Sequence, residues 1–148
     1  MAETTGVING SDLRIFLSST DDSEVLIDNL TDCSISVTTD LRDTTTKNNN
    51  GYRAMLPGLK SATINFTALY ASDATNGYNE LIGYQLADTK IYLLFTHAPD
   101  GTENAGDERF DVSGYITSLE LSGGTEDNGT YTCTVEVHDT IVREAIPA

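Results

Sequence analysis

Regular alternation of apolar and polar residues constrains the fold of this chain most strongly. The clearest instance is residues 61–70 (SATINFTALY), where every second residue is apolar. The same period of two appears in residues 12–18 (DLRIFLS), 31–39 (TDCSISVTT) and 130–139 (TYTCTVEVHD). Successive side chains of a β-strand point to opposite faces of the sheet. These segments therefore predict four strands, each with one face buried and the other exposed.

Other patterns complete a mainly β architecture. Residues 24–28 predict a short strand, and the nearly continuous apolar run at 90–96 (KIYLLFT) predicts a strand covered on both faces. Residues 110–122 predict a long strand whose alternation slips near 114–116, which indicates a β-bulge. Apolar residues at helical spacing predict one short helix within 76–87. We therefore expect an antiparallel β-sandwich or barrel of about seven strands, with the helix over one edge. Turn-rich segments lie at 20–23, 97–109 and 123–128.

The stretch 40–60 (DLRDTTTKNNNGYRAMLPGLK) shows neither the period of two of a strand nor the apolar spacing of a helix. We expect it to be a long projecting loop. It contains four of the eight basic residues of the chain and, between positions 42 and 60, only one acidic residue. Outside positions 42–60 the chain has four basic and twenty-two acidic residues. A basic projection on an acidic body suggests docking onto another copy of the same protein.

Within this stretch, residues 48–51 (NNNG) favour a turn, and the apolar side chains that follow could anchor the loop on a partner. We expect the basic side chains to pair with carboxylates of that partner. The candidate assembly residues are Arg42, Lys47, Asn48, Asn49, Asn50, Gly51, Tyr52, Arg53, Met55, Leu56 and Lys60.

The predicted outward faces of three strands carry Ser, Thr and Asn in place of the usual Lys and Glu. Threonine suits an exposed strand, so this composition can simply reflect strand propensity. The alternative interpretation is a surface past which an anionic polymer moves without binding, because hydroxyls and carboxylates offer no cation to a phosphate. The residues concerned are Ser34, Ser36, Thr38, Thr63, Asn65, Thr67, Thr132, Thr134 and Glu136.

Length and charge exclude several classes of protein. At 148 residues the chain can form one hydrophobic core, and we expect a single domain over 1–148 with an N-terminal arm at 1–11 and a C-terminal tail at 140–148. A net charge of −15 and a pI near 4.1 argue against specific nucleic-acid binding. No run is apolar for the roughly 18 residues of a membrane helix, and no signal peptide begins the sequence. We expect a soluble protein made in a reducing cytoplasm.

No catalytic, cofactor-binding or metal-binding motif stands out. We expect His97 to lie in a loop and His138 on a polar strand face, both as surface residues. Cys33 and Cys133 fall on the apolar sides of their strands, as expected for buried thiols, and the sequence leaves open a disulfide between them. The acidic segment 100–111 matches a calcium-binding loop only poorly. We therefore predict a non-enzymatic, self-associating protein without a cofactor.

An ordered set of segments resembles the major tail proteins, or tail tube proteins, of long-tailed bacteriophages. Residues 38–40 (TTD) lead into 44–52 (TTTKNNNGY) and 56–59 (LPGL), followed by the alternating strand and the short helix. In the C-terminal part, 114–121 (GYITSLEL) precedes an acidic turn and a final Thr-rich strand. Members of the family often have Trp after the loop glycine, where this chain has Tyr52. The likeness covers most of the chain in the same order.

The resemblance implies subunits that form hexameric rings, stacked into a tube that conducts the phage genome into the host. It implies contacts with tape measure, tail terminator and distal tail or baseplate proteins, and passage of double-stranded DNA through the lumen without specific binding. The protein would then lie in the virion tail, after assembly in the host cytoplasm and with no membrane association. The basic loop would contact the next ring, and the polar faces would line the channel. Two alternatives remain open from the sequence: a related tube or baseplate-type protein, such as the type VI secretion tube, and a carbohydrate-binding β-sandwich.

Overall fold

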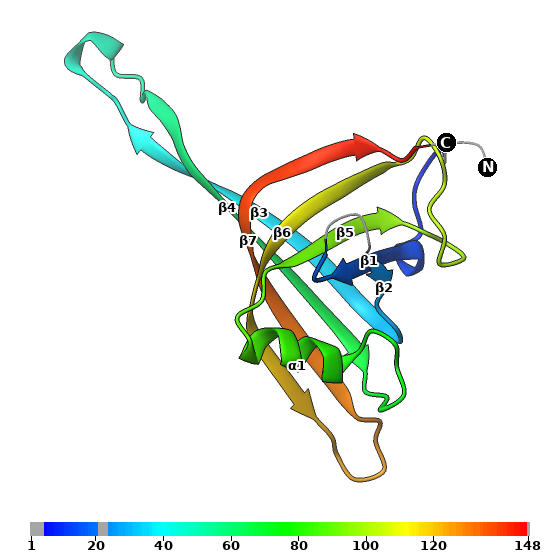
Figure 1. The fold of residues 1–148 in the computed structure, drawn as a ribbon. Helices are drawn as coiled ribbons and strands as arrows, with labels where there is room; N and C mark the ends of the chain where they lie inside the picture. The colour runs from blue at the N-terminus through cyan, green and yellow to red at the C-terminus, as the bar shows by residue number, and fades with distance from the viewer. Residues whose placement is uncertain (1–4, 21–23, 148) are drawn as a thin grey trace.

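The protein is one curled antiparallel sheet with a long hairpin projecting from it (Figure 1). The computed structural model describes residues 5–20 and 24–147. Seven strands are hydrogen-bonded in the order β2-β1-β5-β6-β7-β4-β3. The sheet curls until β3 lies against β1, where the Cys33 thiol donates to the carbonyl of Leu13 at 3.6 Å. The predicted mainly β sandwich or barrel with one helix is confirmed. The elements are η1 (Gly10–Asp12), β1 (Leu13–Ser18), β2 (Val25–Leu26), β3 (Leu30–Asp43), η2 (Lys47–Asn49), β4 (Met55–Leu69), α1 (Tyr78–Leu86), β5 (Ile91–His97), β6 (Glu108–Ser122) and β7 (Thr130–Ala145).

The core lies inside the curl and is built from the alternating apolar residues of the strands. Neighbouring strands contribute residues of the same rows, such as Ile64 paired with Val135, and Phe66 paired with Cys133. Each of these four side chains is almost completely buried. The apolar run of β5 is buried on both faces, as predicted. Burial of alternate residues thus fixes the register of each strand, because a slip of one residue would turn the apolar side chains to solvent.

Helix α1 covers one side of this core. Leu81 is fully buried, and the Tyr78 ring meets the Tyr131 ring edge-on at a centroid distance of 5.8 Å. The helix begins after Gly77, whose N–H donates to Glu80 Oε2 at 3.0 Å. Asn76 is buried, and its amide donates to the carbonyls of Leu17 in β1 and Val25 in β2 at 3.0 and 2.9 Å.

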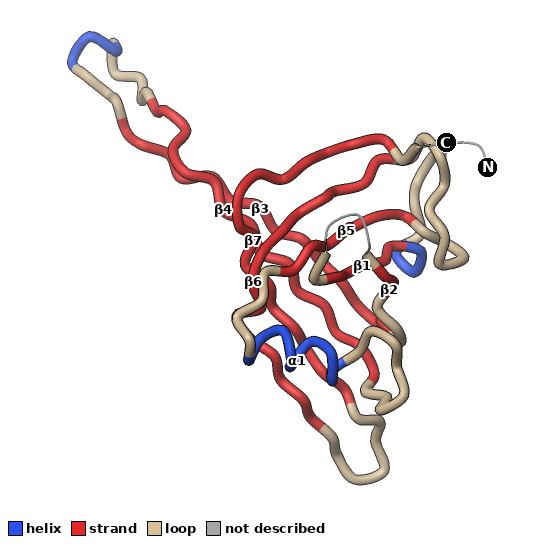
Figure 2. Tube along the Cα trace, in the orientation of Figure 1, coloured by secondary structure: helices blue, strands red, loops and turns tan. Residues whose placement is uncertain are grey.

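The expected projecting loop at 40–60 projects from the sheet as a hairpin, whose two sides are continuations of β3 and β4. β3 continues to Asp43 and β4 begins at Met55, so only residues 44–54 lie between the paired strands. Figure 2 shows the two strands running on together beyond the rest of the sheet. Both faces of this ribbon are exposed, so burial imposes no alternation there and the sequence gives no strand signal.

The segment 140–148 is likewise not a separate tail. β7 continues to Ala145 and pairs with β6 as far as Glu108. A register irregularity opposite Val112 and a positive φ of 70° at Asp139 interrupt the alternation before the strand resumes. The predicted bulge near 114–116 is confirmed, since β6 shifts register on both sides of that segment. The predicted turn at 20–23 and the N-terminal arm fall partly outside the described residues.

Candidate functional site

The hairpin arm, residues 40–60, is the most distinctive surface feature of the molecule. At its tip, Thr46 and Asn49 hold the turn through bonds from the Thr46 N–H and hydroxyl to Asn49 Oδ1 at 2.9 and 2.7 Å. Asn50 and Gly51 follow with positive φ angles of 53° and 83°, a conformation that Asn and Gly adopt most readily. The predicted turn at 48–51 therefore closes a hairpin.

Below the tip, the arm is closed by side-chain bonds to the main chain. The Thr45 hydroxyl accepts from the Ala54 N–H at 2.9 Å, and the Thr44 N–H donates to the Ala54 carbonyl at the same distance. The Asp43 carboxylate accepts from the Thr45 N–H, and the bonds that Thr45 makes lower the pKa of Asp43. These bonds link the two sides of the arm within the subunit.

A β-bulge lies where the arm leaves the sheet. Thr39 pairs with Lys60 and Leu41 with Pro57, so two residues of β4 stand opposite one residue of β3. A Cβ on Gly58 would approach the Asp40 carbonyl to 3.2 Å, so a larger residue would crowd the opposite strand. Bulges bend a ribbon and increase its twist. This bulge separates the arm from the part of β3 and β4 that packs on the core.

Apolar side chains on the arm are exposed although the chain has a well-packed core elsewhere. The exposed fraction is 78% for Tyr52, 53% for Leu56 and 83% for Leu59, and Leu41 and Met55 are exposed as well. A two-stranded ribbon has no interior in which to bury them. A concentration of exposed apolar residues on one element marks a protein–protein contact surface.

The basic residues predicted for assembly are exposed on the same arm. Arg53 lies 3.8 Å from Asp43, and both side chains are largely in solvent, so this pair contributes little stability. Among the described residues, Arg42, Lys47 and Lys60 have no carboxylate within 4.0 Å. The structure therefore brings all the candidate assembly residues onto one projection with unpaired positive charge.

The nine polar residues singled out on three strands lie together on one outward surface, the polar face. They fall in rows across β3, β4 and β7, with the β4 residue in the middle of each complete row. The rows are Ser36–Thr63–Glu136 and Ser34–Asn65–Thr134, together with the pairs Thr67–Thr132 and Thr38–Ser61. Side chains bond within the rows. Thr63 donates to Glu136 at 3.1 Å, Thr134 donates to Asn65 at 2.7 Å, and the Thr67 and Thr132 hydroxyls lie 3.3 Å apart.

The polar face extends further than the sequence indicated. Asp32 on β3 lies opposite Thr67, and Glu120 on β6 lies opposite Thr132, so both belong to it. Ser118, opposite Thr134, extends it across β6. The alternation of residues 31–39 could have predicted that Asp32 faces outward, beside the inward-facing Cys33. The bulge in β6 breaks the alternation before Glu120, so the sequence did not show which face Glu120 lies on. The described face thus presents hydroxyls, an amide and carboxylates, and none of its residues named here is basic.

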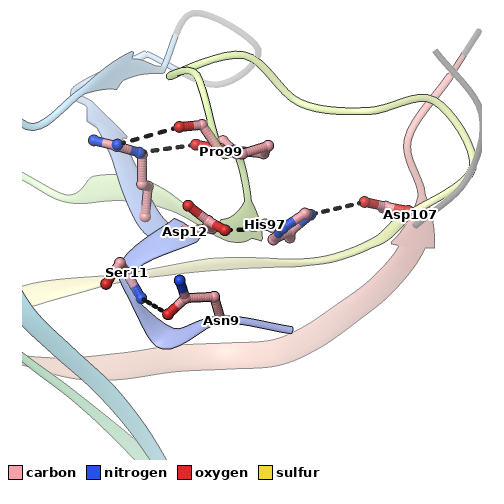
Figure 3. A network of polar contacts seen from close by, with 8 residues as sticks. Asn9, Ser11, Asp12, His97, Pro99 and Asp107 are labelled. Carbon is pink, nitrogen blue, oxygen red and sulfur yellow. Dashed lines mark hydrogen bonds and ion pairs between the residues drawn. The ribbon is translucent and has the colours of Figure 1, made fainter. Parts of the chain in front are cut away.

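His97 is not the surface loop residue that the sequence suggested. It is the last residue of β5 and is buried. Its Nδ1 lies 3.1 Å from Asp107 Oδ2, and its Nε2 lies 3.9 Å from Asp12 Oδ2 (Figure 3). Arg14 reinforces the same region by donating from Nε to the Ala98 carbonyl at 2.8 Å. This network joins the N-terminal segment to the loop between β5 and β6, and it serves the fold.

The two cysteines are free thiols. Both pair with Phe66, one from each side, so one strand separates them. Two strand spacings amount to about 10 Å, beyond the reach of a disulfide. Burial raises the pKa of Cys133 to about 12, and burial, followed by the charge of Asp32, raises the pKa of Cys33. Thiolate chemistry at neutral pH is thereby suppressed at both residues.

Two further observations concern the residues that the structure describes. They contain no group of three or more His, Cys, Asp or Glu side chains arranged to hold a metal ion. No helix among them has the length and apolar composition needed to cross a bilayer.

Comparison with known proteins identifies the family. The model of the phage tail tube protein family matches residues 7–143. A tail protein of an empty gene transfer agent particle is 20% identical, with a TM-score of 0.79 over 94% of this chain and 100% of that chain. The SPP1 tail tube is 16% identical, with a TM-score of 0.70 over 96% of this chain and 81% of that chain. A chain of the anti-feeding prophage baseplate is 6% identical, with a TM-score of 0.64 over 98% and 99%.

These structural likenesses show the fold, and a search of curated proteins finds no match. The family match is decisive because it spans nearly the whole chain and includes the hairpin arm, the polar face and the core. This protein belongs to the phage tail tube protein family.

Proposed function

We propose that this tail tube protein assembles into hexameric rings that stack into a tube, with the hairpin arm making the contact between successive rings. The observation that carries the proposal is the arm itself. It exposes Tyr52, Leu56 and Leu59 together with basic side chains, and nothing described in its own subunit covers them. Burying such residues against a second subunit would remove apolar surface from water and place the positive charges beside carboxylates.

Sixfold rings are supported by the particles in which the neighbours occur. The gene transfer agent tail has C6 symmetry, and the anti-feeding prophage baseplate is sixfold symmetrised. This chain covers the gene transfer agent subunit over its full length. A subunit of the same fold and size can occupy a ring of the same order.

We assign the lumen to the polar face. Four of its hydroxyls bond to one another or to Asn65 and Glu136, which reduces the number of donors that could bind a phosphate. Its charged members Asp32, Glu120 and Glu136 repel phosphate. Nucleic-acid binding depends on Lys and Arg that release counterions from DNA. A wall of this kind lets double-stranded DNA slide without specific binding.

The further partners would be those that a tail tube requires: a tape measure protein inside the growing tube, a terminator at one end and distal tail or baseplate proteins at the other. The protein would lie in the virion tail, after assembly in the bacterial cytoplasm. Its role is structural rather than enzymatic, since family and neighbours are tube and tail proteins.

Deletion of residues 44–51 tests the role of the arm. Asp43 pairs with Met55, so the deletion leaves residues 52–54 as a three-residue hairpin loop. Shortening the loop from eleven residues to three lowers the entropic cost of closing it by about 1 kcal/mol. Loss of the Thr44–Ala54 hydrogen bond costs about the same amount, so the two effects nearly cancel. We expect a folded subunit whose Tm changes by less than about 4 °C but which forms no tubes in negative-stain micrographs. Tubes of normal length from this variant would refute the function of the arm.

A point variant separates the contact surface from the hairpin itself. Leu59→Ser removes an apolar side chain that is 83% exposed and leaves the backbone and the tip unchanged. It should weaken polymerisation while the Tm stays within about 2 °C of the wild type. The matched control is Leu86→Ser, because Leu86 is 79% exposed on α1, away from the arm.

A further inference from the structure

Charge is separated by sign along the long strands of the sheet. β3 and β4 run from the hairpin arm at one end to the Leu30–Ala68 pair at the other. Leu69 then pairs with Thr130, the first residue of β7 after the turn from β6. The loop after β4 and the β6–β7 turn therefore lie at the end of the sheet opposite the arm, as Figure 1 also shows. We call this region, residues 70–75 and 121–130, the far end.

The far end is acidic and exposed. Its carboxylates on Asp73, Glu126 and Asp127 are all exposed. The sequence has no Lys or Arg between Lys60 and Lys90, or between Arg109 and Arg143, so no basic residue belongs to the far end. The sign of its charge is opposite to that of the arm.

Apolar side chains are also exposed at the far end. Tyr70 and Leu121 continue the rows of β4 and β6 that face the core, but they lie at the border of the sheet, where coverage ends. Their exposed fractions are 39% and 44%. The far end thus combines an apolar centre with surrounding carboxylates, and the arm combines apolar side chains with basic ones.

This complementarity selects one arrangement of two copies. Contact between two arms, or between two far ends, would bring like charges together. Contact between the arm of one copy and the far end of another pairs opposite charges and buries apolar side chains from both. Such a contact joins two different surfaces, so it repeats in one direction and builds a filament.

We propose that the far end is the docking surface for the hairpin arm of a second copy, and that this pairing fixes the head-to-tail direction of stacking. The inference deepens the proposed tube function and rests on it. Arg42 and Lys47 meet Glu126 and Asp127 in this arrangement, with Leu56 and Leu59 directed toward the apolar centre. Because both surfaces are desolvated when they meet, the pairs contribute more than exposed ion pairs within one subunit.

Charge reversal on each surface, singly and together, tests the proposal. The far-end variant carries Glu126→Lys and Asp127→Lys; the arm variant carries Arg42→Glu and Lys47→Glu. Each alone should raise the protein concentration required for tube formation by at least about tenfold, measured by sedimentation and negative-stain microscopy. The chain carrying all four substitutions restores opposite signs at the contact and should form tubes within about threefold of the wild-type concentration.

A matched control separates docking from net charge. Asp88→Lys and Asp100→Lys change the net charge by the same amount as the far-end variant, at two exposed acidic residues elsewhere on the surface. Asp88 and Glu126 both have a positive φ, of 53° and 62°, so the control and the far-end variant each place one lysine in the same backbone conformation. The control should polymerise like the wild type, and circular dichroism should show all variants folded.

The outcomes also distinguish this inference from the proposed function. If the wild-type protein forms tubes and the far-end variant forms them equally well, the docking surface is wrong and the tube function stands. The docking surface is also wrong if the chain with all four substitutions needs as high a protein concentration for tube formation as the far-end or arm variant alone. If the wild-type protein forms neither rings nor tubes at any concentration, the proposed function itself fails.

Discussion

Substitution of Gly114 by alanine should destabilise the subunit through one close backbone contact. Gly114 lies in β6 between two register irregularities and pairs with Val137 of β7. A Cβ at this position would overlap the Glu136 carbonyl oxygen and lie 3.0 Å from its carbonyl carbon and 3.1 Å from Val137 Cα. All three atoms are main chain, so no flexible side chain can move aside, and β6 and β7 must separate locally.

The magnitude follows from comparison with other overpacked sites. Forcing an extra methyl group into a closely packed region costs about 1–3 kcal/mol, and the backbone nature of this contact places Gly114→Ala near the upper value. For a domain of this size, about 3 kcal/mol lowers the Tm by roughly 6–12 °C. Thermal unfolding followed by circular dichroism measures it directly.

Gly83→Ala is the matched control. Gly83 lies within α1, and a Cβ there would have no atom within 4 Å. Alanine should therefore raise the free energy of unfolding by about 0.5–1 kcal/mol through helix propensity alone. A Gly114→Ala variant with the wild-type Tm would refute the close approach of β6 and β7 at this point.

Three further expectations concern the thiols, the polar face and the buried histidine. Burial keeps Cys133 protonated in the folded protein with a pKa of about 12, whereas in the unfolded chain it loses its proton above its ordinary value of 9.0. The contribution of Cys133 to the free energy of unfolding should therefore be constant below about pH 9 and fall between pH 9 and pH 12, and a thiol reagent at pH 8 should modify Cys133 only after denaturation. Thr132→Arg should leave tube assembly intact but slow genome ejection from particles, whereas Thr132→Glu at the same exposed position should not; equal ejection by both would contradict the lumen assignment. Asp107→Ala removes a buried partner of His97 and should cost about 2–3 kcal/mol in urea unfolding, a loss that an unchanged midpoint would disprove.

Where one face of a strand is buried, the sequence was sufficient to predict the fold. The strand at 61–70 alternates over its whole length because Ala62, Ile64 and Phe66 all face the core. The same argument located the polar face, since a residue beside a buried neighbour must point outward. The basic charge of the arm and the absence of basic residues on the polar face are properties of composition, and they are visible before any folding.

Burial gave no such guidance where both faces of a strand meet solvent, or where bulges shift the register. The arm was expected to be irregular because Leu41, Leu56 and Leu59 follow no period, and only pairing between distant residues shows that it is a hairpin. His97 was expected at the surface because its partner Asp107 is separated from it by a loop that folds back.

By itself, the sequence determined a β-rich domain, an acidic body and a basic segment within residues 40–60, because alternation and charge are local properties. The tertiary structure decided that this segment is a hairpin arm, that the polar residues of three strands form one face, and that the acidic far end lies opposite the arm. These facts depend on strand order and register. The alternation within a strand shows only which of its faces is buried. Which strands become neighbours depends on contacts between residues far apart in the chain, and no local pattern encodes these contacts.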